Sequence, residues 1–371
     1  MKYLFIVLLA LAMISCNSTT DSGPHDLTAD QMIGQMVMVG FRGFEVSQDS
    51  QIARDISRGI VGGVILFDKD ASLGTYERNI QSPEQLARLV SGLQSFAATK
   101  LFISIDQEGG RVSRLKTNYG FPASVSQQYL GTLNNPDTTH FYGTRTAKML
   151  SDAGVNLNFA PVVDVNVNPQ CPVIGALERS FSSDPVVVGS NAEIVIGEHS
   201  SRGISCALKH FPGHGSSQSD SHLGVVDVTN TWQQYELDPY RYLFGKKIVD
   251  MVMTAHIFNG NIDGVYPATL SYSTITGVLR NTLGFDGVVI TDDMNMKAIA
   301  DNYGFEKAVE LSINAGVDII LVANNLQYNK YAADTTYQTI RRLYSDGKIS
   351  LERIRQSYTR IMALKAKRLA S

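Results

Sequence analysis

Short runs of hydrophobic residues recur along the chain, and each is followed by a longer segment of helical character. Eight such runs occur, at 36–41, 63–67, 101–106, 155–160, 205–210, 251–256, 288–292 and 318–322. The candidate helices include 83–99, 138–153, 185–202, 231–249, 305–315, 334–344 and 351–369. Ser82-Pro83 and Asp184-Pro185 each place a capping residue before a proline suited to the first helical turn, which supports two of these helix starts.

Strands that are apolar on both faces and alternate with helices imply a parallel sheet covered by helices, either an open doubly wound sheet or a closed barrel. Eight repeats favour a single (β/α)8 barrel of the TIM type. No GxGxxG follows the first strand and no Walker loop is present, which weakens the nucleotide-binding alternative. We expect residues 27–371 to form this one domain.

Polar residues gather just after the apolar part of several predicted strands. They are Asp106-Gln107-Glu108, Asp164, Lys209-His210, His256 and Asp292-Asp293. The carboxyl ends of the strands are where barrel enzymes carry their chemistry. The pattern therefore predicts an active site at that end of the barrel.

The N-terminal segment is typical of an export signal. A lysine follows Met1, and residues 3–14 form an apolar run that is short for a membrane span. The run ends at Ser15-Cys16, which resembles a lipoprotein cleavage site, so we expect 1–15 to be removed and Cys16 to be lipidated. Residues 16–26 are small and polar, as in a flexible tether. The alternative is an ordinary secretory signal with an incidental cysteine. In either case the protein is exported, and a lipid anchor would hold it on a membrane facing the periplasm or the cell surface.

Composition narrows the possibilities further. With 371 residues, 44% hydrophobic and 18% charged, the chain can bury one large core. The net charge is -3, from 32 Lys and Arg against 35 Asp and Glu, which argues against a nucleic-acid partner. Besides Cys16 only Cys171 and Cys206 are present, and Cys206 lies in an apolar run where a buried thiol is expected, so no disulfide is predicted.

Asp292 closes the apolar run at 288–292 and is the first candidate for chemistry. A carboxylate at the mouth of a barrel can attack an anomeric carbon or stabilise a positive transition state. A salt bridge or a helix cap would also explain an acidic residue there. Asp293 suits the cap better, because it would meet the amides of a following helix.

The densest polar segment is 209–222, with three histidines and an aspartate. His210 and His214 are four residues apart, a spacing that chelates a metal on a helix, but Pro212, Gly213 and Gly215 make a helix improbable. We therefore predict no metal.

Asp220 and His222 offer a better interpretation of this segment, because a carboxylate two residues away can orient an imidazole and favour its protonated form. Such a histidine can act as general acid and base. The alternative is a surface loop with incidental polar residues.

The segment 209–215, KHFPGHG, resembles the signature of glycoside hydrolase family three, in particular its β-N-acetylglucosaminidase branch. Four further matches follow the order of the family: 106–112 (DQEGGRV), 158–165 (NFAPVVDV), 172–175 (PVIG) leading to 179–181 (RSF), and 291–294 (TDDM). Together they span nearly the whole predicted domain.

The resemblance implies a role for each matching residue. Asp292 would be the nucleophile, and His222, paired with Asp220, would be the general acid and base on a mobile loop. The sugar hydroxyls would be held by Asp106, Arg179, Lys209 and His210, while His214 would shape the loop. No metal or organic cofactor is implied.

Lys209 and His210 are neighbours, and side chains of neighbouring residues point to opposite faces of a regular strand. Both are nevertheless assigned to one pocket. An irregular backbone, such as the non-proline cis peptide that the resemblance suggests, would bring both side chains to the same side.

The resulting hypothesis is a retaining exo-acting β-N-acetylglucosaminidase that hydrolyses terminal β-linked GlcNAc from peptidoglycan fragments or related glycans, through a glycosyl-enzyme intermediate. The glycan is the expected partner, and the membrane is contacted only through the lipid anchor. Alternatives are a β-N-acetylglucosaminide phosphorylase, since an imidazolium admits phosphate where a carboxylate would repel it, a β-glucosidase or β-xylosidase, and a non-catalytic glycan-binding lipoprotein.

Overall fold

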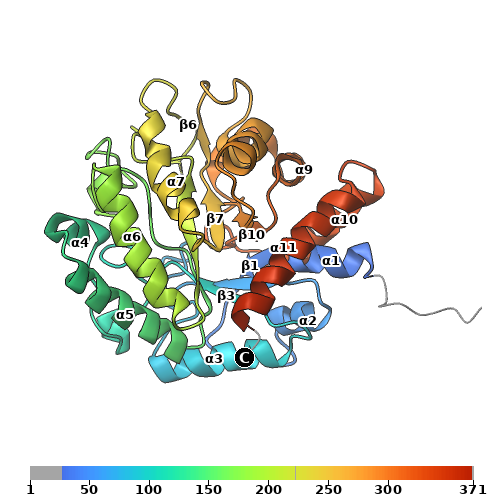
Figure 1. Ribbon diagram of the computed structural model, residues 1–371. Coiled ribbons are helices and arrows are strands. Elements are labelled where there is room, and N and C mark those ends of the chain that lie inside the picture. Colours follow the sequence, from blue (N-terminus) through green and yellow to red (C-terminus); the bar gives the residue numbers. More distant parts are fainter. Residues whose placement is uncertain (1–26, 222, 370–371) are drawn as a thin grey trace, which may run out of the picture.

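Eight parallel strands form a barrel in the computed structural model, which describes residues 27–221 and 223–369 (Figure 1). The strands are β1 (Val37–Gly40), β2 (Gly63–Leu66), β3 (Phe102–Ile105), β4 (Leu157–Asn158), β5 (Ser205–Phe211), β7 (Met251–Thr254), β9 (Val288–Ile290) and β10 (Ile320–Val322). Each predicted strand is confirmed, and most are shorter than their apolar runs. The order is β10-β1-β2-β3-β4-β5-β7-β9, and a bridge between Ile290 and Ile319 joins the two end strands. The (β/α)8 barrel is confirmed.

Helices surround the barrel. They are α1 (Ala29–Gln35), α2 (Gln51–Ser57), α3 (Pro83–Ser95), α4 (Gln127–Leu133), α5 (Pro136–Asp152), α6 (Pro185–Ser200), α7 (Asp238–Gly245), α8 (Lys297–Tyr303), α9 (Phe305–Ala315), α10 (Ala332–Ser345) and α11 (Leu351–Leu369). The other helical segments are the 3-10 turns η1 (Thr117–Tyr119), η2 (Gly175–Leu177), η3 (Gln234–Leu237) and η4 (Ala268–Leu270), and the π-helix η5 (Ser273–Thr282). Both predicted caps are present: the side chain of Ser82 accepts from Gln85 N, and that of Asp184 accepts from Val186 N.

The prediction of one long helix at 231–249 is wrong. This segment instead contains η3 followed by the eight-residue α7. Pro239 lies in the first turn of α7, a position that a proline can occupy because it needs no intrahelical donor there. Lys247 adopts a φ of 58°, which no longer belongs to a right-handed helix.

Several elements were not predicted from the apolar pattern. Among them is a two-stranded parallel ribbon, β6 (Val226–Asp227) with β8 (Ile257–Phe258). The helix η5 is another, and its β-branched residues and glycine give it a low helix propensity.

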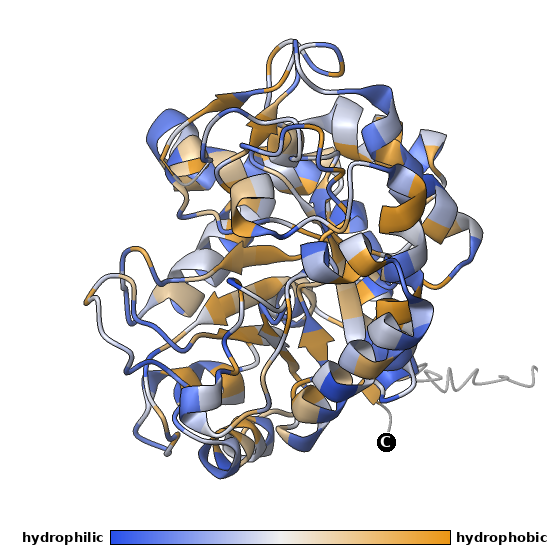
Figure 2. Ribbon diagram, turned by 90° about the vertical axis from the view of Figure 1, so that its left-hand side faces the viewer, coloured by the Kyte–Doolittle hydropathy of each residue, from blue (hydrophilic) through white to orange (hydrophobic). Residues whose placement is uncertain are grey.

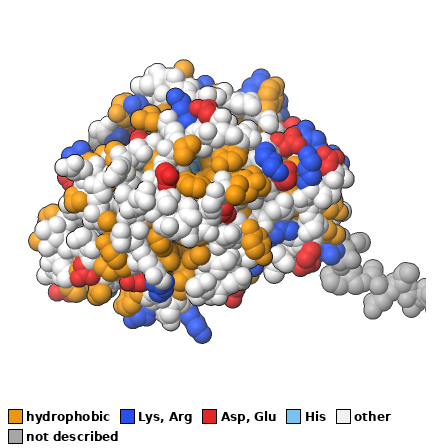
Figure 3. Space-filling view, turned by 90° about the horizontal axis from the view of Figure 1, so that it is seen from above, with side chains coloured by type: hydrophobic (Ala, Val, Ile, Leu, Met, Phe, Trp, Pro, Cys, Tyr) orange, Lys and Arg blue, Asp and Glu red, His pale blue; other side chains and the backbone are white. Residues whose placement is uncertain are grey.

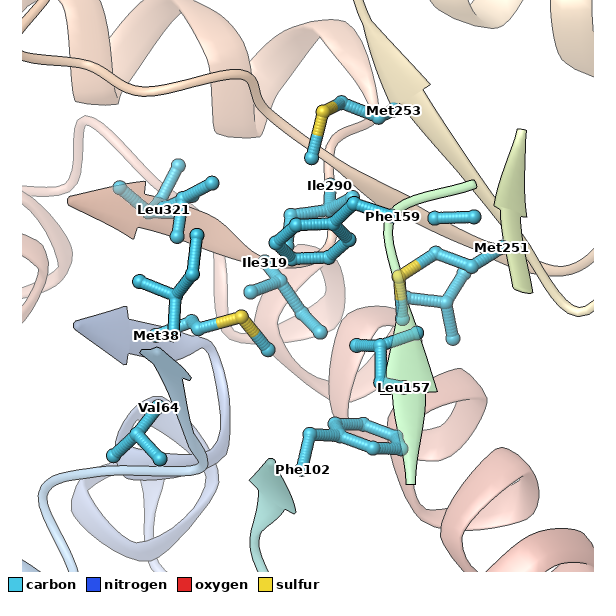
Figure 4. Close-up of a cluster of buried hydrophobic side chains, with 14 of the residues drawn as sticks. Met38, Val64, Phe102, Leu157, Phe159, Met251, Met253, Ile290, Ile319 and Leu321 are labelled. Carbon is cyan, nitrogen blue, oxygen red and sulfur yellow. The ribbon is translucent and has the colours of Figure 1, made fainter. Parts of the chain in front are cut away.

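The interior of the barrel is filled by hydrophobic side chains contributed by strands all around it. Figure 4 shows side chains that converge from the surrounding strands: Met38, Val64, Phe102, Leu157, Phe159, Met251, Met253, Ile290, Ile319 and Leu321. Such layers make the barrel a packed core rather than a pore. The strands are accordingly the most hydrophobic part of Figure 2, and polar residues lie mainly on the outer helices and loops.

The junction between β9 and β10 is held by the buried carboxylate of Asp318. Its Oδ2 accepts from Val289 N at 3.0 Å, and the guanidinium groups of Arg280, Arg353 and Arg360 bind it at 2.8, 2.9 and 3.3 Å. Arg353 and Arg360 belong to α11, which packs beside α1 (Figure 1). The last described helix therefore stabilises the closure of the barrel.

Cys171 and Cys206 are both free and buried, and Cys206 lies in β5, as expected. Within 27–221 and 223–369, none of the helices combines the length and apolar character needed to cross a membrane. Seen from the side of α7 and β6, the surface carries separate apolar patches between polar groups and charges of both signs (Figure 3).

Candidate active site

A cavity of about 320 Å³ opens at the carboxyl ends of the strands. This volume is near the lower end of the range of small-molecule sites, roughly 300–1,000 Å³. Seven of the residues predicted from the sequence line it together: Asp106, Arg179, Lys209, His210, His214, Asp220 and Asp292. Two predicted residues, His222 and Cys16, lie outside the described part of the chain.

Four charged side chains form a network on one wall of the cavity. Lys209 Nζ binds Asp106 Oδ1 at 2.8 Å and Glu108 Oε1 at 2.6 Å. The guanidinium of Arg179 binds both carboxylate oxygens of Glu108, at 2.7 and 2.8 Å. Burial alone would raise the pKa of each carboxyl group, but nearby cations hold both pKa values below their usual range. The strongest of these cations is Lys209 for Asp106 and Arg179 for Glu108. The network is therefore ionised.

The same network keeps the side chain of Arg179 positively charged. Burial would lower its pKa, but the charge and hydrogen bonds of Glu108 raise it above the ordinary value. A permanently charged donor is thus presented at a wall where sugar hydroxyls can accept.

His210 is oriented from both sides. Its Nδ1 lies 2.7 Å from Asp164 Oδ2, and its Nε2 lies 3.2 Å from Arg179 Nη2. Because a guanidinium can only donate, Nε2 accepts and the ring proton lies on Nδ1, facing the carboxylate. Burial would raise the pKa of Asp164, but His210 lowers it on balance. Asp164 therefore accepts as a carboxylate.

Asp164 also anchors the loop that follows β5. Its Oδ1 accepts from His214 N at 2.8 Å. The ring of His214 lies 2.7 Å from Ser217 Oγ and 3.2 Å from Ser221 Oγ. Burial lowers the pKa of His214 to about 4, so this ring is neutral near pH 7. These contacts place the ring of His214 within the loop, between Ser217 and Ser221.

The peptide bond between Lys209 and His210 is cis, as are Ala160-Pro161 and Phe211-Pro212. The side chains of Lys209 and His210 both line the cavity. The expected irregular backbone is confirmed at this position.

Asp292 lies just beyond β9, and one of its oxygens accepts from Asp293 N at 2.8 Å. The prediction that Asp293 caps a helix is wrong, since α8 begins only at Lys297 and its N-cap is Met296. Asp293 Oδ1 instead accepts from Asn295 N at 3.1 Å and Ala323 N at 2.9 Å. Asp293 thus ties the loop after β9 to the loop after β10.

Sequence reasoning assigned no role to three residues of this site. Glu108 and Asp164 orient their neighbours, and Arg114 lines the cavity with its Nη2 3.3 Å from Asp106 Oδ2. Glu108 and Asp164 were noted at strand ends, but only the fold identifies their partners. In the described ranges no group of three His, Cys, Asp or Glu side chains is placed to hold a metal ion.

Comparison with known proteins places the chain in a family. The model described as "Glycosyl hydrolase family 3 N terminal domain" matches residues 28–364. Beta-hexosaminidase A of Pseudoalteromonas piscicida is 34% identical, over 92% of this chain and 61% of its own length. A beta-hexosaminidase of Tolumonas auensis is 32% identical, over 78% of this chain and 83% of its own length.

Two solved structures support the same family assignment. A family 3 beta-N-acetylglucosaminidase from Paenibacillus has a TM-score of 0.84 and 35% identity, covering 93% of this chain and 63% of the other. Beta-N-acetylhexosaminidase from Beutenbergia cavernae has a TM-score of 0.81 and 26% identity, covering 92% and 99%. The chain thus spans less than two thirds of the Pseudoalteromonas and Paenibacillus relatives. The resemblance seen in the sequence motifs is confirmed, and the chain belongs to glycosyl hydrolase family 3.

Proposed function

We propose that this protein removes terminal β-linked N-acetylglucosamine from glycans with retention of configuration. The observation that carries the proposal is the single cavity that gathers Asp292, Asp220 and four sugar-binding candidates at the carboxyl ends of the strands. The names of the relatives, beta-hexosaminidase and beta-N-acetylglucosaminidase, supply the substrate class.

The reaction would proceed in two steps. The carboxylate of Asp292 attacks the anomeric carbon, while protonated His222, oriented by Asp220, gives its proton to the departing glycosidic oxygen. In the second step neutral His222 takes a proton from water, and the resulting hydroxide displaces Asp292 from the sugar. The sugar leaves with its original configuration, and both side chains return to their starting states.

The charged wall would grip the sugar ring. Lys209, Arg179 and Arg114 are donors and Asp106 is an acceptor, and all four line the cavity. Ion pairs of Asp106 with Lys209 and Arg114, and of Glu108 with Arg179, hold them in place before the sugar arrives, so little reorganisation is needed as the ring distorts. Contacts that strengthen during this distortion would lower the barrier of the first step.

We further propose that the natural substrates are peptidoglycan fragments or similar glycans, and that the protein is an exported lipoprotein anchored through Cys16. The apolar segment ending at Ser15-Cys16 supports the anchor. Metabolic labelling with a palmitate analogue tests it: the wild-type protein should be labelled and Cys16→Ala should not.

The activity is tested by chromophore release from aryl β-N-acetylglucosaminide and aryl β-glucoside, using the full chain in detergent. We expect release of the acetamido sugar only, with a loss of most of the rate in Asp292→Ala and His222→Ala. The matched controls are Asp286→Ala and His140→Ala, which remove an exposed aspartate and an exposed histidine. Absence of release by the folded wild-type protein would leave a glycan-binding role instead.

The product distinguishes hydrolysis from phosphorolysis. With phosphate in the buffer, a hydrolase releases free N-acetylglucosamine, whereas a phosphorylase releases the sugar 1-phosphate. Identification of the sugar by mass spectrometry after reaction with and without phosphate separates the two.

A further inference from the structure

The mouth of the cavity has no part in the mechanism proposed above. With about 320 Å³ the cavity is small for a ligand site and suits a single sugar, so the rest of a glycan must lie outside it. Asn325 and Leu326, in the loop after β10, line the cavity, and Leu326 is 41% exposed. Leu326 therefore lies where the cavity opens to solvent.

This side of the mouth is next to the proposed nucleophile. Asp293, which follows Asp292, accepts through Oδ1 from Ala323 N at 2.9 Å, two residues before Asn325. The charged network lies across the barrel from β10, after β3, β4 and β5. A sugar whose hydroxyl groups are bound by that network presents its anomeric carbon to Asp292. The departing group therefore lies toward the loop after β10.

A second loop meets the loop after β10 at this point. It is the rim loop (69–77), which follows β2. The side chain of Asn325 accepts from Ala71 N at 3.0 Å and donates to Lys69 O at 3.2 Å. The backbone oxygen of Asn325 accepts from Ser72 N, also at 3.0 Å. The rim loop thus extends the wall of the cavity outward.

The rim loop is held in place by a buried carboxylate. Of its residues only Asp70 is buried, and Arg42 and Arg78 bind the side chain of Asp70 at 2.6 and 2.7 Å. Leu73 N donates to Asp70 Oδ1 at 3.0 Å, and Arg78 also donates to Asn324 O at 2.8 Å in the loop after β10. A surface that is already ordered loses little conformational entropy when a ligand binds, so this loop is suited to recognition.

Large apolar side chains are exposed along the rim loop. Leu73 is 61% exposed and Tyr76 is 54% exposed. The ammonium groups of Lys69 and Lys116 lie 5.6 and 5.0 Å from the centre of the Tyr76 ring. A sugar has C–H groups on its faces and hydroxyl groups at its edge. These features match an aromatic ring that is bordered by ammonium donors.

We infer that the rim loop and Leu326 form a subsite for the sugar on the reducing side of the cleaved bond. Tyr76 and Leu326 contact the C–H face of this sugar, and Lys69 donates to its hydroxyl groups. The natural leaving group is then a sugar rather than a small alcohol. The inference rests on the proposed function and adds to it the recognition of the leaving group.

Kinetics with two substrates test the subsite. One is the β-1,4-linked disaccharide of N-acetylglucosamine, and the other is N-acetyl-β-glucosaminyl fluoride, whose leaving group is a single atom. The measure is the ratio of kcat/KM for the disaccharide to kcat/KM for the fluoride. We expect Tyr76→Ala, Leu326→Ala and Lys69→Met each to lower this ratio about fivefold, mainly through KM of the disaccharide.

Matched controls come from the outer helices. Tyr242 and Lys246 of α7 form an equivalent pair, with the ammonium group 5.1 Å from the centre of the ring, and Tyr242 is 42% exposed. Leu133 of α4 is 48% exposed and matches Leu326. Tyr242→Ala, Lys246→Met and Leu133→Ala should leave the ratio within twofold of the wild-type value.

Binding provides a readout that needs no turnover. In the full chain carrying Asp292→Ala, calorimetric titration should show that the disaccharide binds at least tenfold more tightly than N-acetylglucosamine. Adding Tyr76→Ala or Leu326→Ala should reduce this preference about fivefold.

The two measurements separate failure of the inference from failure of the proposed function. Hydrolysis of both substrates with a ratio that none of the three rim variants changes would refute the subsite and leave the function standing. Equal affinities for the disaccharide and the monosaccharide would also refute the subsite. A protein that hydrolyses neither substrate, but binds the disaccharide through Tyr76 and Leu326, would refute the proposed function and retain the subsite.

Discussion

Replacing Glu108 by Gln tests whether the ion-pair network of the cavity stabilises the fold. The substitution keeps the shape of the side chain but removes the charge that faces Arg179 and Lys209. Removing one partner of a buried ion pair costs about 3–5 kcal/mol. Because Gln retains one acceptor oxygen and Lys209 keeps Asp106, we expect the lower end, about 3 kcal/mol.

The assay is urea or thermal unfolding at pH 7. For a domain of this size, a loss of 3 kcal/mol corresponds to a fall in Tm of about 4 °C. Glu178→Gln is the matched control, because Glu178 pairs with Arg111 on the surface at 3.8 Å and such exposed pairs contribute about 0–1 kcal/mol. Equal unfolding free energies for the two variants would refute the reasoning.

The pH dependence of the same difference checks its electrostatic origin. The pKa of Glu108 is lowered in the folded protein, so the folded state binds fewer protons than the unfolded state in the acid range. Its stabilising contribution is therefore complete above the unfolded pKa, near 4.3, and is lost as the pH falls through the lower folded pKa. The stability difference between wild type and Glu108→Gln should be constant from pH 6 to pH 8 and should shrink in acid.

Three other predictions concern the loop after β5, the orientation of His210 and the buried Lys365 of α11. Gly215→Ala would place a Cβ on the backbone of the segment after β4 and should lower kcat/KM at least tenfold, whereas Gly224→Ala, with open space around it, should not. Asp164→Asn should lower kcat/KM about a hundredfold, because His210 loses the carboxylate that fixes its tautomer; an unchanged KM with a reduced kcat would show that binding survives. Burial lowers the pKa of Lys365 to about 7, so between pH 7 and pH 9 the unfolded state binds more protons and stability should rise by about 2 kcal/mol. Lys365→Met should abolish that rise in urea unfolding.

The sequence was most informative where one element could be recognised without its neighbours. The apolar runs identified all eight strands because parallel strands buried on both faces need no polar positions. Helices with a clear cap, such as α3 and α6, began at the predicted residue. The seven-residue helices α1, α2, α4 and α8 were missed because so few turns carry little periodic signal.

The site was predictable only in part, for a related reason. Asp106, Lys209 and Asp292 could be found because polar residues that directly follow an apolar strand are conspicuous. The partners of Glu108 and Asp164 are 71 and 46 residues away in the chain, and no local pattern reveals them. The cap assigned to Asp293 failed because α8 begins three residues later than the local pattern indicated.

The way the barrel closes has a consequence for the protein during its synthesis. β1 pairs with β10 across nearly three hundred residues, and the arginines of α11 bind the carboxylate between β9 and β10. Until α11 has been made, that carboxylate lacks two of its cations and the two sides of the barrel cannot be joined in their final form. A growing chain therefore keeps its apolar strands unclosed for most of translation, which is the state in which a chaperone can bind it.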